Sequence, residues 1–282
     1  MRIWSVRRGL RTERQGLVYA TQFPELNALL TDFVCAVRSI LRDNLVGVYL
    51  TGSFALSGGD AASDCDFLVA TAARVGRDEE YSLRQLHAEI PTGSSYWACN
   101  LEGSYAPRAD LQTAAALGRR WLYVNRGGRE MEWSTHCNTE DVRWVLAERP
   151  LVLTGVDPRE FACEVPRVIL QTTMRTQIEN FLDDLMTWTT FDIAWTQRYA
   201  VEASSRMLYT LEHDEVVSKQ HALQWAARTL PAEWRDLIDQ VRNDRFVQWN
   251  DSPRPGTVDR TLAFVAYVQH CARTGNHRCA PM

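Results

Sequence analysis

Two aspartates placed after a Gly-Ser pair constrain this chain more than any other feature. Asp64 and Asp66 begin an apolar run, twelve residues after Gly52-Ser53, which ends another apolar run. In a β-strand alternate side chains share a face, so both carboxylates point one way and Cys65 points the other. Neighbouring carboxylates are the hard oxygen ligands that Mg²⁺ prefers. The spacing therefore predicts a strand that carries a phosphate-handling metal site.

The Gly-Ser pair fits the same interpretation. Gly52 allows backbone N–H groups to approach a phosphate closely, and Ser53 adds a hydroxyl group. We expect the next residues, Phe54 to Leu56, to begin a helix whose N-terminus favours an anion. A metal held by the two aspartates would then bind the triphosphate of a nucleotide.

Composition narrows the class of protein. A chain of 282 residues with 45% hydrophobic residues is globular and long enough for two domains. The net charge of −4, without a dominant basic block, argues against a nucleic-acid partner. No apolar stretch has the length of a membrane span. We expect a cytoplasmic protein.

The seven cysteines form no Cys-x-x-Cys pair, which indicates reduced thiols rather than a disulfide or zinc framework. The adjacent pairs His136-Cys137 and His270-Cys271 make no metal site unaided, because neighbouring side chains diverge.

Apolar periodicity divides the chain into two parts. In the first, helices are predicted from Pro24 to Asp43-Asn44 and over 78–89, with strands over 45–51, 64–70 and 95–102. From Pro158 onward strand signals stop, and helices are predicted over 164–188, 194–212, 218–228, 231–246 and 256–272. We therefore expect an α/β (α+β) domain with a mixed sheet over 23–157 and an all-α helical bundle over 158–282. Residues 1–22 are expected to be a loosely ordered extension.

Lys219 is the only lysine among 31 basic residues. One explanation is codon bias with a chance survivor. However, Lys219 follows Ser218, a good N-cap, and so lies at a helix N-terminus, where the helix dipole disfavours a cation. A bound polyphosphate would reverse that penalty.

Gly52-Ser53 followed by Ser63-Asp64-Cys65-Asp66 resembles the nucleotidyltransferase superfamily. The second half narrows the resemblance. It resembles the aminoglycoside 3''/9-adenylyltransferases at Arg206, in the run 218–227 that contains Lys219, and in the run 230–234. The similarity covers roughly residues 23–272. The resemblance implies a nucleotidyltransferase domain before the helical one. It also implies Mg²⁺-dependent transfer of AMP from ATP to a hydroxyl, most familiarly on streptomycin or spectinomycin, and hence antibiotic resistance. We expect a monomer.

The resemblance also assigns roles to residues. Asp64 and Asp66 would hold the metal, and Glu102 would be the general base at the end of the strand Tyr96–Leu101. Arg206 and Lys219 would contact the ATP phosphates, which Gly52, Ser53 and Ser63 also contact. For single residues the alternatives are solvated strand-end acids, and an ordinary pair between Arg206 and Glu202.

For the acceptor, the resemblance points to Trp133 as a stacking wall and to Asp192 as an acid in the same cleft, which suits a cationic small molecule. Trp133 could instead be a core residue. Thr196 departs from the family, because streptomycin-modifying members have a second acid there. Arg245 replaces an aromatic residue near the nucleotide.

Two other functions remain open. The same site could adenylylate a protein, as in antitoxin-type nucleotidyltransferases, or the chain could bind a nucleotide without catalysis. The second is disfavoured by Glu102, which a purely binding protein does not need.

Overall fold

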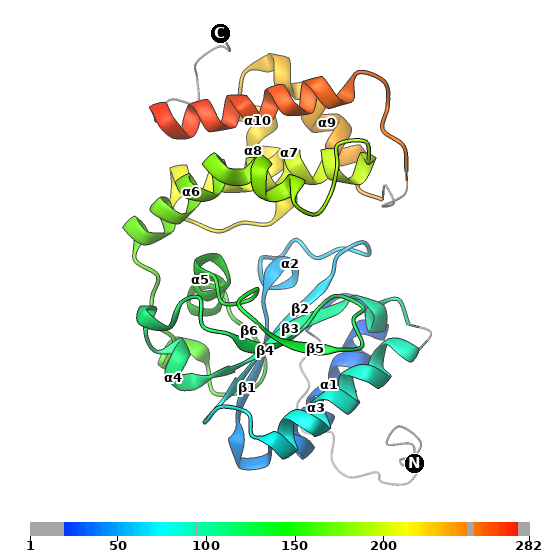
Figure 1. Cartoon of the computed structure of the whole chain (residues 1–282), viewed down its shortest axis with the longest axis vertical. Helices are drawn as coiled ribbons and strands as arrows, with labels where there is room; N and C mark the ends of the chain where they lie inside the picture. Colours follow the sequence, from blue (N-terminus) through cyan, green and yellow to red (C-terminus); the bar gives the residue numbers. More distant parts are fainter. Residues whose placement is uncertain (1–19, 94, 247–250, 276–282) are drawn as a thin grey trace.

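The structure, a computed structural model, describes residues 20–93, 95–246 and 251–275. A sheet with its covering helices forms one part and a layered group of helices forms the other (Figure 1). Most of the predicted N-terminal extension lies outside the described residues. Within the described part, hydrogen bonds from Thr21 to the Asn27 side chain join this residue to the first helix.

The sheet has six strands in the order β5-β4-β3-β2-β1-β6. Their bounds are β1 Leu45–Leu50, β2 Cys65–Thr71, β3 Leu101–Pro107, β4 Trp121–Val124, β5 Met131–Ser134 and β6 Leu151–Gly155. Strands β2 and β3 are parallel, and the other neighbours are antiparallel. The sheet is therefore mixed, as predicted, and the starts of β2 and β3 lie at the same edge.

The third strand differs from its predicted position over 95–102. A 3-10 turn, η4 Trp97–Asn100, precedes β3, so Glu102 is near the beginning of its strand and not at the end. The Asn100 side chain donates to the Tyr96 carbonyl at 2.6 Å and closes this turn. The strand pattern begins only afterwards, with Leu101 and Tyr105 buried on one face.

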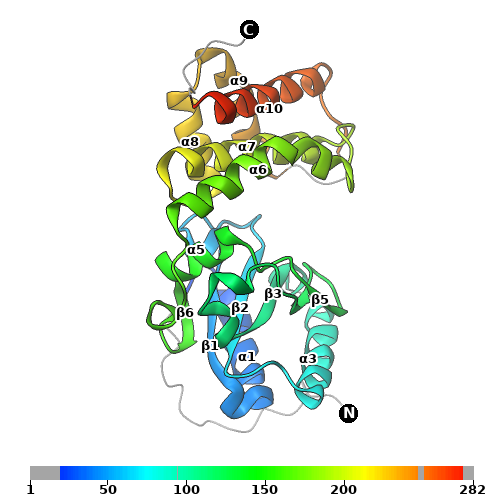
Figure 2. The same ribbon diagram turned by 60° about the vertical axis from the view of Figure 1, so that its left-hand side comes forward.

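Helices cover both faces of the sheet (Figures 1 and 2). One face packs on α1 Pro24–Leu41 and α3 Arg77–Glu89, whose apolar residues share a core with β1, β2 and β3. Both helices were predicted from apolar spacing. The short η2 Arg42–Asn44 and η3 Ile90–Thr92 follow α1 and α3, and α4 Arg108–Leu111 and η5 Ala114–Ala116 lie between β3 and β4. The other face carries a smaller core that includes α5 Glu140–Glu148 and η6 Pro158–Glu160 at its margin.

The second part is helical, as predicted. It contains α6 Arg167–Met186, α7 Ala194–His213, α8 Lys219–Thr229, η7 Ala232–Trp234, α9 Arg235–Asn243 and α10 Thr257–Thr274. Helix α7 is central, because α6, α8, α9 and α10 all pack against it. A second apolar core joins these helices and also includes Trp144 and Val145 of α5. None of the described helices is long and apolar enough to cross a membrane.

Candidate functional site

Three carboxylates meet where β2 and β3 begin. Asp66 is paired in register with Glu102, and Asp64 lies one position before β2. Cys65 is buried in the core on the opposite face, as strand alternation requires. Burial, followed by the charges of Glu102 and Asp64, raises the pKa of Asp66 to about 7. The predicted pair of aspartates is therefore joined by Glu102 in one anionic group.

This group fits a divalent cation. Burial also raises the pKa of Asp64, against the opposing charge of Arg126, whose Nη1 lies 3.0 Å from Asp64 Oδ1. Carboxylates that repel each other in a buried site are stabilised by a metal ion. Within the described ranges no cluster of three or more His, Cys, Asp or Glu side chains is arranged as a metal site. Mg²⁺ would accordingly take its other ligands from phosphate and water, as it commonly does.

Gly52 brings the end of β1 against Asp66. Its φ of +54° lies in the left-handed region, and a Cβ atom there would sit 1.9 Å from Asp66 Oδ2. The N–H of Thr51 donates to the Asp66 carbonyl at 2.9 Å. Only glycine tolerates both the positive φ and the close approach of the Asp66 carboxylate. The helix that follows, α2 Gly52–Ala55, begins at this glycine, two residues before the predicted start.

Gly52→Ala is expected to lower the melting temperature by more than Gly118→Ala does. Gly118 also has a positive φ, +71°, but a Cβ atom there meets nothing within 4 Å. Each substitution costs about 1–2 kcal/mol for the left-handed backbone, and only the new methyl group at position 52 must also displace a buried carboxylate. Thermal unfolding of both variants measures the difference. Equal losses would show that the approach to Asp66 has no energetic consequence.

Glu102 is held by two side chains that sequence reasoning did not assign to the site. Tyr123 Oη donates to Glu102 Oε1 at 2.7 Å, and His136 Nε2 lies 3.1 Å from the same oxygen. Burial alone would raise the pKa of Glu102, but these hydrogen bonds and the backbone amide of Arg126 hold it below its usual value. The bond to Glu102 in turn raises the pKa of His136. Glu102 is therefore ionised at neutral pH.

Cations of the helical part face these carboxylates. Helix α8 begins at Lys219, and the N-cap Ser218 accepts a hydrogen bond from the His221 N–H. The charges of Lys219 and Arg206 both lower the pKa of Asp66, against its burial. Nε of Arg206 is buried without a hydrogen-bond partner among the described residues. The structure thus brings both predicted cations to the predicted aspartates. Their role as phosphate ligands stays a prediction.

The loop between α2 and β2 touches the helical part at two points. A Cβ atom on Gly58 would lie 2.3 Å from Ser218 Cβ, so the loop and the start of α8 are in close contact. Arg245, after α9, makes two hydrogen bonds to Asp60, of 2.9 and 3.0 Å, and one of 3.2 Å to Ser63 Oγ. The Ser63 hydroxyl also donates to Asp60. Ser63 therefore supports this contact, and the structure gives its hydroxyl partners other than a phosphate.

The structure does not bring the predicted acceptor residues into this group. Trp133 is paired with Leu122, on the sheet face that packs against α1 and α3, and Arg74 lies over its ring at 4.1 Å. Glu102 and Tyr123 lie on the other face, so the structure does not place Trp133 beside them, and its role as an acceptor wall stays a prediction. Asp192 is exposed before α7. Thr196 is fully buried and hydrogen-bonded to Thr189, so it lines no cleft.

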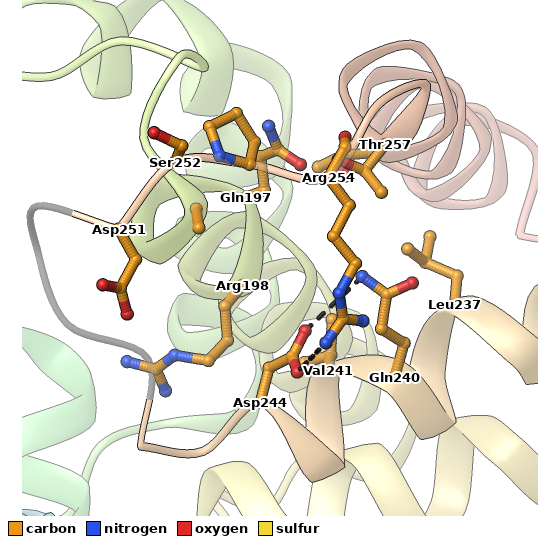
Figure 3. A pocket seen from close by; sticks show the side chains of 13 residues that line it. Gln197, Arg198, Leu237, Gln240, Val241, Asp244, Asp251, Ser252, Arg254 and Thr257 are labelled. Atoms are coloured by element: carbon orange, nitrogen blue, oxygen red, sulfur yellow. Dashed lines mark hydrogen bonds and ion pairs between the residues drawn. The ribbon is translucent and has the colours of Figure 1, made fainter.

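A cavity of about 360 Å³ opens beside Arg198, between α7, α9 and the segment that leads into α10 (Figure 3). Its wall includes Gln197 and Arg198 of α7, together with an ion pair of 2.7 Å between Arg254 and Asp244. The wall is polar and carries both signs of charge. It offers space for a small polar ligand next to Arg198.

Comparison with known proteins finds three kinds of match. Residues 163–269 match the family model of the aminoglycoside adenylyltransferase C-terminal domain. A spectinomycin 9-adenylyltransferase of Campylobacter jejuni is 22% identical over 263 residues, covering 88% of this chain and 95% of the relative. One from Staphylococcus aureus is 23% identical over 260 residues, with 84% and 92% covered.

Among solved structures, the spectinomycin adenyltransferase AAD(9) from Enterococcus faecialis, determined with ATP and spectinomycin, aligns with a TM-score of 0.67. The alignment has 16% sequence identity and covers 88% of this chain and 99% of that chain. The two proteins share the fold, a mixed sheet with its helices followed by a helical part.

Proposed function

We propose, from the likeness of this chain to the aminoglycoside adenylyltransferase family, that it transfers AMP from ATP to a hydroxyl group of an aminocyclitol or aminoglycoside. The observation that carries the proposal is the meeting of Asp64, Asp66 and Glu102 with Lys219 and Arg206 from the other domain. Adenylyl transfer needs both halves of this arrangement. The carboxylates serve the metal and the attacking oxygen, and the cations serve the phosphates.

Asp64 and Asp66 would hold Mg²⁺, which neutralises charge on the phosphates when bound. Lys219 and Arg206 supply fixed positive charge for the β- and γ-phosphates. Gly52, pressed against Asp66, places the start of α2 beside the same group. We assign Ser53, the next residue, to the phosphates as well.

Glu102 is the proposed base. The acceptor hydroxyl gives its proton to the Glu102 carboxylate while its oxygen bonds to the α-phosphorus of ATP, and the bond from that phosphorus to the bridging oxygen breaks. Pyrophosphate leaves with the bonding electrons. Tyr123 and His136 hold Glu102 ionised and oriented by bonding its Oε1 atom.

Among acceptors we favour the spectinomycin type over streptomycin. The relatives from Campylobacter jejuni and Staphylococcus aureus are both named spectinomycin 9-adenylyltransferases. In addition, position 196 is a buried threonine that can offer no carboxylate to a guanidinium group. Asp192, exposed at the start of the helical domain's central helix, remains a proposed acid contact for an acceptor amine.

One experiment tests the proposal directly. Purified protein is incubated with ATP, Mg²⁺ and a panel of aminocyclitols, and pyrophosphate release and product mass are measured. We expect spectinomycin to gain one AMP and streptomycin to react at least tenfold more slowly. AMP found only on a protein would indicate an antitoxin-type enzyme. Nucleotide binding without any AMP product would indicate a protein that binds without catalysis.

A further inference from the structure

Glu202 is a buried carboxylate surrounded by cations in the helical domain. Arg198, Glu202 and Arg206 follow each other at intervals of four residues on α7, so they lie on one face of this helix. Glu202 is only 1% exposed and Arg198 is 6% exposed. A buried ionised acid is expensive unless it is paired, so the partners of Glu202 define what it does.

The two oxygens of Glu202 serve two helices. Oε1 accepts a hydrogen bond from Arg198 Nη1 at 2.7 Å. Oε2 lies 3.8 Å from Nζ of Lys219, the first residue of α8, and has no hydrogen-bond partner among the described residues. The carboxylate therefore binds one cation firmly and attracts the other without a hydrogen bond. Lys219 is left able to rotate onto another anion while Glu202 stays bound to Arg198.

The charges around Lys219 show why a carboxylate is needed there. Burial lowers the pKa of Lys219, and the neighbouring charges of Arg206, Arg198 and Arg245 lower it further, while Glu202 opposes them. On the sheet side, Asp64 and Asp66 interact with Lys219 at longer range. The aromatic ring of Tyr199 lies 5.8 Å from Nζ. Within the helical domain, Glu202 is the carboxylate that compensates these cations.

We propose that Glu202 is a positioning residue, which is anchored by Arg198 and holds the Lys219 ammonium group at the phosphate site before the nucleotide arrives. The inference rests on the proposed function in one respect, since it takes a nucleoside triphosphate as the ligand of this cluster. Arg198 also lines the cavity of Figure 3, so Glu202 fixes one cation at the cavity and one at the carboxylates. The rival explanation is an ordinary helix-stabilising pair between Glu202 and Arg198.

The single lysine makes the test direct. In protein labelled with ¹⁵N at the side-chain amine of lysine, Nζ of Lys219 gives the only labelled signal, and its titration reports the pKa of that one group. We expect Glu202→Gln to lower this pKa. It should also raise the dissociation constant for Mg²⁺-ATP about tenfold, because the Lys219 ammonium group is no longer held in place before binding. On a Lys219→Met background, Glu202→Gln should have little further effect on ATP affinity. This non-additivity is expected because Glu202 acts on ATP only through Lys219.

Glu215→Gln is the matched control. Glu215, in the segment between α7 and α8, forms an ion pair of 2.5 Å with Arg149. The variant therefore also loses an ion pair, but Glu215 contacts none of Arg198, Arg206 and Lys219. We expect this variant to leave both the Lys219 titration and the ATP affinity unchanged. Glu202→Asp, which keeps the charge but shortens the side chain, should give intermediate values.

The outcomes are separable. A folded Glu202→Gln protein with wild-type ATP affinity and an unchanged Lys219 titration would overturn the proposal and support the rival helix pair. Should Glu202→Gln fail to fold, Glu202→Asp decides in the same way, and wild-type values in that variant overturn the proposal. ATP affinity and the lysine titration need no acceptor. These two measurements can therefore support the positioning role of Glu202 even if no AMP transfer is found. The absence of AMP transfer would count against the proposed function alone.

Discussion

Glu102→Gln is expected to lower kcat for AMP transfer by about 10²–10⁴-fold, the usual contribution of a general base. The amide has nearly the same shape and cannot accept the acceptor's proton. Because Tyr123 donates to Glu102 Oε1, the variant should keep its fold with the amide oxygen in that position. Single-turnover formation of adenylylated product measures the chemical step, and ATP binding should change little.

A neighbouring glutamate provides the control. Glu132 lies on β5 opposite Tyr123 and is exposed, so Glu132→Gln keeps the loss of charge but leaves Glu102 in place. We expect less than about a twofold change in kcat, as for surface changes generally. A comparable fall in kcat in the two variants would show that the loss of negative charge, and not the loss of a base, explains the effect of Glu102→Gln.

The hydrogen bonds to Glu102 also fix the pH dependence. Since they hold its pKa below the usual value, Glu102 should stay ionised into the mildly acidic range, and its contribution as a base should be lost as it takes up a proton. His136→Ala removes one donor, which raises the pKa of Glu102 and moves the acidic limb of the rate profile to higher pH. An unmoved limb would mean that another group controls it.

Asp66→Asn is expected to reduce Mg²⁺-dependent turnover by at least about 10²–10³-fold, comparable with the loss of other fixed transition-state stabilisers. The same change should stabilise the Mg²⁺-free protein. Burial and two neighbouring carboxylates raise the pKa of Asp66 from 3.8 to about 7. The stability contributed by this group is therefore fully present below the unfolded pKa, and is lost as pH rises through the folded value of about 7.

Asparagine removes that ionisation. At pH 8 without Mg²⁺ we expect Asp66→Asn to raise the free energy of unfolding by up to about 4 kcal/mol, and below pH 4 by almost nothing. Urea unfolding at the two pH values measures the difference. Asp236→Asn is the control, since that side chain is 89% exposed. Lower stability of Asp66→Asn at both pH values would contradict a repulsive carboxylate group at the site.

The sequence allowed the helices and the carboxylates to be predicted because their signals are local. Apolar residues at helical spacing locate α1, α3 and the helices α6 to α10 of the second part, and Asp64 and Asp66 share a face through strand alternation. The start of β3 was misplaced for a local reason as well. The Asn100 side chain closes a turn over residues that otherwise suit a strand.

Contacts between distant segments could not be predicted in this way. Trp133 followed a family pattern, but its face is set by pairing with Leu122, which no single strand reveals. His136 was not assigned to a site because its neighbour Cys137 diverges from it, yet from the turn after β5 it reaches Glu102 on β3. For Glu202 the helical spacing suggested Arg206, whereas the fold pairs it with Arg198 and brings Lys219 across from α8.

The order of elements along the chain has a consequence for synthesis on the ribosome. All six strands are complete by Gly155, so the sheet can close in the nascent chain while the long helices are still being made. Until Arg206, Lys219 and Arg245 emerge, the anionic edge of that sheet has no cations from the helical domain. Vectorial folding would then complete the proposed nucleotide site last, when Lys219 and Arg245 join the carboxylates.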